Sequence, residues 1–89
     1  MKYYVYVIQS EKDGRCYTGY AADLHLRLQR HNEGWSRSTK GYSPWKLVYS
    51  EAFESKSKAL ARERQLKSWK SRRAIEDLIA RHAGGRPDL

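Results

Sequence analysis

The sequence contains a single cysteine, Cys16, and no apolar run that approaches 18 residues. One cysteine excludes a disulfide within the chain and is typical of a reducing compartment. Without a long apolar run, no segment is expected to span a membrane. The first residues lead into a strand pattern, whereas a signal peptide would begin with an apolar segment. We therefore expect a cytoplasmic protein.

Acidic residues are also few. The chain has 18 Lys and Arg but only 10 Asp and Glu, which gives a formal net charge of +8. Residues 34–46 contain three cations and no acid, and residues 55–82 contain nine cations and three acids. Clusters of this kind are typical of surfaces that bind nucleic-acid phosphates. A solvated helix surface or an acidic protein partner would give the same composition.

The motifs of several enzyme classes are missing as well. The chain has no P-loop, no dinucleotide fingerprint and no serine nucleophile motif, and Cys16 has no local partners for a zinc site. Eighty-nine residues are too few for two domains that each bury enough surface, so we expect one domain over residues 1–82 and a flexible tail over 83–89.

Residue patterns predict six elements in the order ββαβαα. An Asp-Gly turn at 13–14 separates the first two strands, Asp23 is a good N-cap, and Gly34 ends the helix that follows. This order predicts an α/β (α+β) sandwich in which helices cover a three-stranded sheet. The expected strands are 2–9, 15–20 and 47–53, and the expected helices are 24–33, 55–69 and a last one that begins at Ser71.

The hairpin places two tyrosines on one face of the sheet. With an even-length connection, Tyr6 and Tyr17 point the same way, and Gly19 leaves space beside them. Their hydroxyls could surround a phosphate or a water molecule. Tyrosines also pack across strands for purely structural reasons.

The helix over 24–33 turns two polar residues toward the core. Leu24, Arg27, Leu28 and His31 fall on one arc, with Leu26 opposite. An arginine at the core margin needs an anion, which could be a phosphate or a structural carboxylate. His31 could accept a proton from water or tyrosine, or it could be a satisfied edge residue.

The helix over 55–69 carries one carboxylate on its buried face. Ala59, Leu60, Glu63 and Leu66 occupy neighbouring angles. A carboxylate there must be paired or bind a metal, and Mg²⁺ commonly uses one or two carboxylates with water and phosphate oxygens. The structural alternative is an ion pair between Arg27 and Glu63.

A polar loop over 34–46 combines three aromatic residues with its cations. Trp35, Tyr42 and Trp45 could stack on bases, or they could cover the small core. Ser71, at the start of the last helix, could hold a phosphate. The candidate nucleic-acid-binding cations are Arg37, Lys40, Lys46, Lys67, Lys70, Arg72 and Arg73.

Over residues 2 to about 80 the chain resembles the GIY-YIG nuclease superfamily, and within it the short stand-alone bacterial branch of UPF0213-like proteins. Tyr4-Val5-Tyr6 stands where the family has GIY, and Tyr17-Thr18-Gly19 where it has YIG. Arg27 matches the family arginine, His31 follows it as in some branches, and Glu63 matches the metal-binding glutamate. Two departures are Tyr4 in place of the first glycine, and the absence of an asparagine after Glu63.

The resemblance implies a three-stranded antiparallel sheet flanked by helices and a DNA endonuclease that uses one Mg²⁺ or Mn²⁺ per site. Glu63 would hold the metal and Arg27 would neutralise the scissile phosphate. Tyr6, Tyr17 or His31 would be the base. We expect structure-selective cleavage linked to DNA repair or recombination, with RNA as an alternative substrate and a protein partner possible. The rival hypothesis is a non-catalytic module that binds nucleic acid or protein through the same basic surface.

Overall fold

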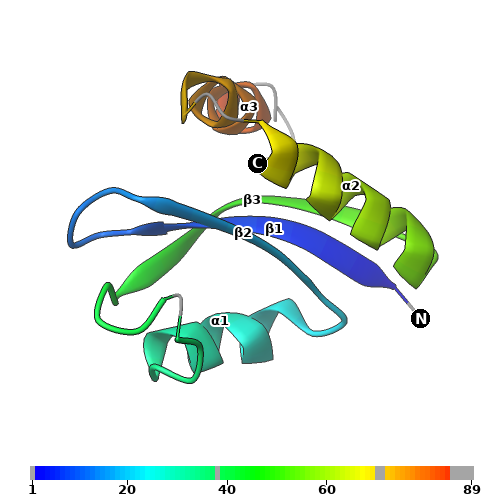
Figure 1. The fold of residues 1–89 in the computed structure, drawn as a ribbon. Coiled ribbons are helices and arrows are strands. Elements are labelled where there is room, and N and C mark those ends of the chain that lie inside the picture. Colours follow the sequence, from blue (N-terminus) through cyan, green and yellow to red (C-terminus); the bar gives the residue numbers. More distant parts are fainter. Residues whose placement is uncertain (1, 38, 70–71, 85–89) are drawn as a thin grey trace.

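The computed structural model describes residues 2–37, 39–69 and 72–84. A three-stranded antiparallel sheet lies between helices, as Figure 1 shows. Within the described ranges, no helix combines the length and the apolar character that crossing a membrane requires. The elements are β1 (Tyr3–Ser10), β2 (Cys16–Ala21), α1 (Leu24–Asn32), β3 (Trp45–Phe53), α2 (Lys56–Ser68) and α3 (Arg72–Gly84).

β1 is the central strand of the sheet, whose order is β2-β1-β3. Its β-branched and aromatic residues suit a strand that is covered on both faces, and Val5, Tyr6, Val7 and Ile8 are at most 2% exposed. Alternation along the strand sends Tyr6 and Ile8 to one face and Val5 and Val7 to the other. The sheet therefore separates two small cores.

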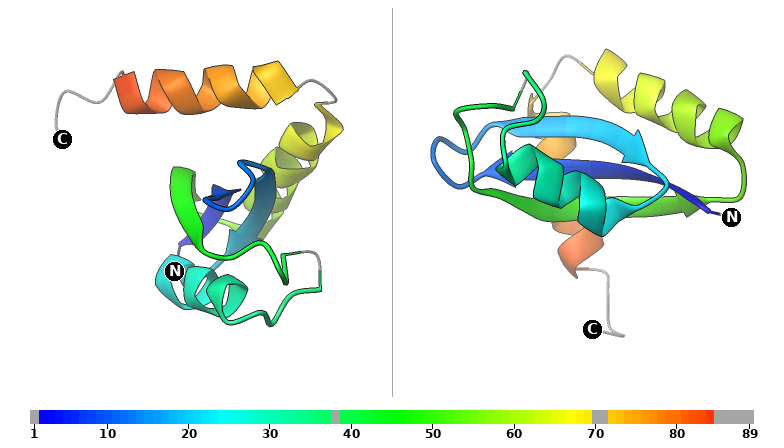
Figure 2. Two further views of the ribbon diagram at one scale, coloured as in Figure 1. Left: turned by 90° about the vertical axis from the view of Figure 1, so that its left-hand side faces the viewer. Right: turned by 90° about the horizontal axis from the view of Figure 1, so that it is seen from below.

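The two cores are covered by different helices, which Figures 1 and 2 show on opposite sides of the sheet. On one face Leu24 and Leu28 of α1 pack against a cluster that contains Tyr6 and Ile8. On the other face Leu66 of α2 packs with the cluster around Val5, and Leu78 of α3 packs against it.

α1 begins at Leu24 as predicted, and α2 covers Lys56–Ser68, one residue shorter at each end than the predicted 55–69. A side-chain cap precedes each of the two helices. The Asp23 carboxylate accepts a hydrogen bond from the Leu26 backbone N–H at 3.0 Å, and Ser55 Oγ accepts one from Lys58 at 3.3 Å. α1 ends as expected before Gly34, which has φ +82° and adopts the left-handed conformation that glycine favours.

The predicted fold is confirmed, with small shifts at the element ends. β1 and β2 each lie one residue later than predicted, and α1 ends one residue earlier. β3 begins at Trp45, two residues before the predicted start at residue 47. α3 includes residues 83 and 84, which the sequence assigned to the tail. Ser71 and residues 85–89 lie outside the described residues, so the helix start at Ser71 and its phosphate contact stay predictions.

Candidate active site

Two tyrosines lie on the sheet face that α1 covers, as the hairpin pattern predicts. Tyr6 pairs with Gly19 and Ile8 pairs with Tyr17, so all four residues share this face. A Cβ atom added to Gly19 would lie 2.6 Å from the Tyr6 hydroxyl oxygen and 2.8 Å from its Cζ atom. The missing side chain at Gly19 therefore makes the space that the Tyr6 hydroxyl occupies.

Buried hydrogen bonds connect Tyr6 to the end of α1 and the loop beyond it. Tyr6 Oη lies 2.8 Å from Nε2 of His31, whose side chain is 2% exposed. Nδ1 of the same ring lies 2.8 Å from Oγ1 of Thr39, which is fully buried. The Thr39 hydroxyl donates in turn to the Ser36 carbonyl at 3.4 Å. Both ring nitrogens of His31 are thus satisfied inside the protein.

The contact between the Thr39 hydroxyl and the Ser36 carbonyl favours one tautomer of His31. When the Thr39 hydroxyl proton goes to that carbonyl, Thr39 Oγ1 accepts a hydrogen bond from Nδ1–H of His31. Nε2 is then the unprotonated nitrogen, and it accepts the hydrogen bond that the Tyr6 hydroxyl donates. The arrangement presents a neutral imidazole as an acceptor for the Tyr6 proton.

Burial acts on the acid–base properties of both groups. Burial lowers the pKa of His31, and the nearby charge of Arg27 lowers it further. Burial also raises the pKa of the Tyr6 hydroxyl, to which Tyr17 and Glu63 add, while the charge of Arg27 acts in the opposite direction. At neutral pH the pair is therefore a neutral tyrosine that donates to a neutral histidine.

Side chains that close the loop after α1 hold Thr39 in place. Asn32 Oδ1 accepts a hydrogen bond from the Trp45 backbone N–H at 2.5 Å, and its Nδ2 donates to the Trp45 carbonyl at 3.3 Å. The Trp45 indole N–H donates to the Thr39 carbonyl at 3.1 Å. Ser10 Oγ donates to the Tyr42 carbonyl at 2.6 Å. The loop is thus tied to the first residue of β3 and the last residue of β1.

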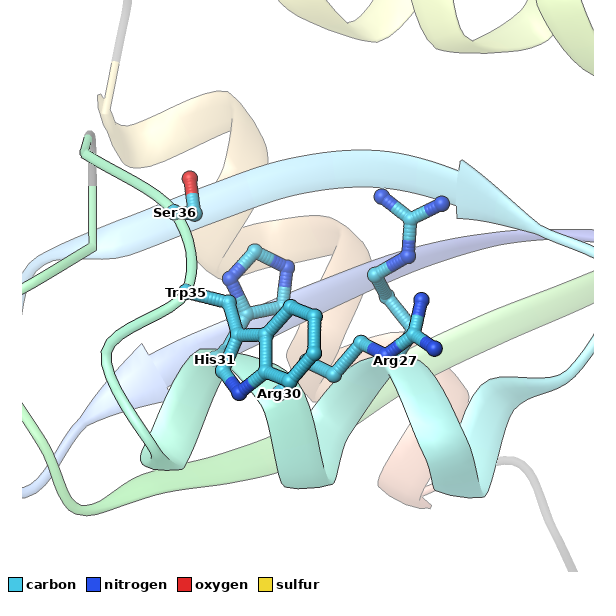
Figure 3. Close-up of a pocket in the computed structure, with 5 residues that line it drawn as sticks. All are labelled: Arg27, Arg30, His31, Trp35 and Ser36. Carbon is cyan, nitrogen blue, oxygen red and sulfur yellow. The ribbon is translucent and has the colours of Figure 1, made fainter.

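A pocket of about 200 Å³ opens beside His31, lined by Arg27, Arg30, His31, Trp35 and Ser36. In Figure 3, Arg27 and His31 extend from α1 toward the sheet, and the Trp35 ring lies in front of His31. The Arg30 guanidinium carbon lies 4.7 Å from the Trp35 ring centroid, a cation–π arrangement. Two exposed arginines at the mouth of a pocket suit an anionic ligand such as a phosphate.

Glu63 comes to this site from α2. Its side chain is 16% exposed, and its carboxylate pairs with the Lys67 ammonium one turn later, at 3.0 Å. The Lys67 nitrogen lies 5.5 Å from the Tyr17 ring centroid, and the Tyr17 ring centroid lies 5.1 Å from that of His31. The ion pair expected as an alternative, between Arg27 and Glu63, is not among the ion pairs of the described residues, where Glu63 pairs with Lys67.

The structure brings Tyr6, Tyr17, Arg27, His31 and Glu63 together around the α1 face and the adjoining part of α2. In the described residues, no cluster of three or more His, Cys, Asp or Glu side chains is placed to hold a metal ion. A single carboxylate that already binds a cationic ammonium fits a Mg²⁺ or Mn²⁺ ion that takes its other ligands from water and phosphate. It does not fit a metal cage built from protein ligands alone.

The aromatic residues of the loop divide between the two expected roles. Trp45 is 3% exposed and belongs to the core beneath α1, and Tyr42 packs against it. Trp35 is 68% exposed beside the pocket.

Most of the candidate nucleic-acid-binding cations are exposed: Arg37, Lys40, Lys46, Lys67 and Arg73. Lys70 and the side chain of Arg72 lie outside the described part of the chain.

Sequence reasoning missed Thr39, Arg30 and the contact between Lys67 and Glu63. The spacing of Glu63 and Lys67, four residues apart on a helix with the acid first, is a signal that could have identified their pair. Arg30 follows Arg27 by three residues and so lies on a neighbouring part of the same helix. Thr39 lies in an irregular loop, where no periodicity indicates which side chains are buried.

Comparison with known proteins gives relatives over almost the whole chain. Residues 2–76 match the family model described as the GIY-YIG catalytic domain. A UPF0213 protein of Staphylococcus saprophyticus is 41% identical over 76 residues, which cover 84% of this chain and 92% of the relative. A UPF0213 protein of Staphylococcus aureus is 43% identical over 68 residues, which cover 75% and 82% of the two chains. The solution NMR structure of a UPF0213 protein from Bacillus halodurans is similar with a TM-score of 0.58 and 38% identity, over 90% of this chain and 84% of that one.

Proposed function

Because the chain belongs to the GIY-YIG catalytic domain family, we propose that it is a metal-dependent endonuclease that hydrolyses phosphodiester bonds in DNA. The observation that carries the proposal is the 2.8 Å hydrogen bond between the Tyr6 hydroxyl and Nε2 of the buried His31. A tyrosine alone is a poor base at neutral pH, since its proton leaves only near pH 10. Paired with an imidazole acceptor, it can pass on a proton that it receives.

In the proposed reaction, Tyr6 accepts a proton from the attacking water as its own hydroxyl proton moves to Nε2 of His31. His31 becomes an imidazolium whose Nδ1–H still donates to Thr39 Oγ1. The new hydroxide attacks phosphorus, and the bond to the leaving oxygen breaks. The leaving oxygen takes a proton from a solvent water, and His31 returns its extra proton through Tyr6 to the hydroxide that remains. Tyr17, which is more exposed than Tyr6, orients the water.

Two charged groups complete the proposed site. Arg27 lines the pocket and neutralises charge on the scissile phosphate. Glu63 would hold one Mg²⁺ or Mn²⁺, which when bound supplies Lewis-acid stabilisation of the leaving oxygen. The carboxylate lies close enough to Tyr6 for its charge to raise the pKa of the tyrosine. Glu63, which would hold the metal, and Tyr6, which would accept the proton, therefore lie close together.

We further propose that the substrate is branched, nicked or otherwise irregular DNA, met in DNA repair or recombination. A chain of 89 residues has little surface for reading a long sequence. The pocket beside His31 carries exposed cations and one exposed tryptophan, which suit a phosphate next to an unstacked base.

The test is cleavage of labelled flap, nicked, single-stranded and duplex DNA, with an RNA control, in Mg²⁺ or Mn²⁺. Wild-type protein should cut, whereas Glu63→Gln, Arg27→Ala and His31→Gln should each lose at least about 100-fold in rate. His25→Gln, on the same helix as His31, is the matched control and should cut at the wild-type rate. Failure of the wild type to cut any substrate would favour a non-catalytic binding module, as would a Glu63→Gln variant that cuts as well as wild type.

A further inference from the structure

The Glu63 carboxylate already has a cation bound to it. Lys67 Nζ lies 3.0 Å from Glu63 Oε2, and the two residues are one helical turn apart on α2. The Glu63 side chain is 16% exposed and the Lys67 side chain is 49% exposed, so the acid is largely buried and the lysine is in contact with solvent. A partly buried carboxylate is stabilised by such a partner.

A second contact holds the ammonium on the active-site side of α2. Lys67 Nζ lies 5.5 Å from the Tyr17 ring centroid, within the range of a cation–π interaction. Lys67 is thus bound between a carboxylate and an aromatic face. Its two partners are residues that the proposed function uses.

We propose that Lys67 competes with the divalent metal ion for Glu63 and thereby sets the metal concentration at which the site fills. This inference rests on the proposed function, because it takes Glu63 as the metal ligand. A divalent ion on the carboxylate and an ammonium 3.0 Å from one of its oxygens repel each other strongly. Metal binding therefore requires the long, flexible lysine side chain to leave Glu63.

The test measures Mn²⁺ binding to the protein without DNA, by loss of the electron paramagnetic resonance signal of free Mn²⁺. Lys67→Gln should bind Mn²⁺ about three- to tenfold more tightly than wild type. Lys67→Arg, which keeps the charge, should bind Mn²⁺ like wild type. Lys58→Gln is the matched control, because it makes the same change on α2 about 13 Å away along the helix, beyond the screening length in physiological salt.

Two outcomes separate this inference from the proposed function. If Glu63→Gln loses Mn²⁺ binding but Lys67→Gln binds no more tightly than wild type, the competition is refuted and the metal site stands. If Glu63→Gln binds Mn²⁺ as wild type does, or no variant binds Mn²⁺, both proposals fail.

A measurement on the wild-type protein removes any dependence on how the variants fold. During titration with diamagnetic Mg²⁺, the Lys67 ε-methylene NMR signals should shift with the same apparent Kd as the signals of Glu63. Lys58 signals should not shift. Unchanged Lys67 signals at saturation of Glu63 would overturn the proposal.

Discussion

At the scale of single residues, Thr39 decides what His31 can do. Its hydroxyl lies 2.8 Å from His31 Nδ1, and the residue is fully buried. By accepting from Nδ1–H it leaves Nε2 free to accept the Tyr6 proton. Thr39 is therefore a positioning residue that acts through the histidine.

Replacing Thr39 with valine tests this role. Thr39→Val removes the acceptor and leaves a buried ring N–H without a partner, which should cost about 1–3 kcal/mol of unfolding free energy. Urea denaturation measures that loss, and ¹⁵N NMR of the imidazole should show a mixture of tautomers. Thr39→Ser keeps the hydroxyl and should keep the wild-type tautomer, with faster DNA cleavage than Thr39→Val. Equal tautomer populations in both variants would contradict the role.

His31 also makes stability depend on pH. Burial lowers its pKa in the folded protein below the ordinary value of 6.5, so the unfolded chain binds the proton first as the pH falls. Stability is then fully present above about pH 6.5 and is lost as the pH falls through the folded pKa. Urea denaturation at pH 7.5 and pH 5 should show this loss in wild type and in His25→Gln. His31→Gln should show a smaller loss, and a loss equal to that of wild type would assign the pH dependence to other groups.

At the scale of elements, the register of the hairpin places the site. Tyr6 faces Gly19 across the β1–β2 pair, and the absent side chain at Gly19 leaves room for the Tyr6 hydroxyl. A shift by one residue would turn every side chain of β2 to the opposite face. The position of the hydroxyl near His31 therefore depends on the pairing of the two strands.

Gly19→Ala should displace the Tyr6 ring, because the new Cβ would lie 2.6 Å from its hydroxyl oxygen. Overpacking of this kind costs about 1–3 kcal/mol, and the hydrogen bond to His31 should be lost with it. The double variant Gly19→Ala/Tyr6→Phe lacks the closest clashing atom and should recover part of the stability, but none of the cleavage activity. Thermal unfolding and a cleavage assay measure the two effects. A Gly19→Ala variant of wild-type stability would show that the strand can move away.

Periodicity predicted the parts of the site that lie on regular elements. Tyr6 and Tyr17 share a face because strand side chains alternate, and His31 turns inward because of the helical period. Loop contacts have no such pattern. Trp45 was placed in a loop, yet it begins β3, since the Asn32 side chain pairs with its backbone from 13 residues away. Thr39 is buried by the same loop closure, which depends on tertiary contacts.

Ion pairs were harder to predict than faces. The helical period correctly predicted that Glu63 faces the interior. Which cation pairs with Glu63 depends on which side chains lie within reach in the folded protein. Arg27 was expected as an alternative partner, whereas Lys67, on the same helix, is the one observed. Because Glu63 and Lys67 lie on one helix, their pair forms without the entropy cost of closing a loop. This favours Lys67 over a cation from another element.

At the scale of the whole molecule, the net charge of +8 suits a polyanion. The three ion pairs of the described residues use Arg15, Arg62 and Lys67. Arg37, Lys40 and Lys46 are exposed and lie on the loop that follows α1 or at the start of β3. They would extend a DNA-binding surface away from the pocket.

This surface predicts a particular salt dependence of DNA binding. Replacing Arg37, Lys40 and Lys46 with glutamine should lower the slope of log K against log salt by about 0.9 for each duplex phosphate contact removed. The control replaces three exposed cations of α2 with glutamine: Lys56, Lys58 and Arg64. This change removes the same charge from a helix that lies across the sheet from α1 (Figure 1). Fluorescence anisotropy between 50 and 200 mM salt measures both slopes. If DNA binds through the face that α1 covers, only the first set changes the slope by about 0.9 per contact; equal changes in both sets would mean that the charge acts without a defined binding face.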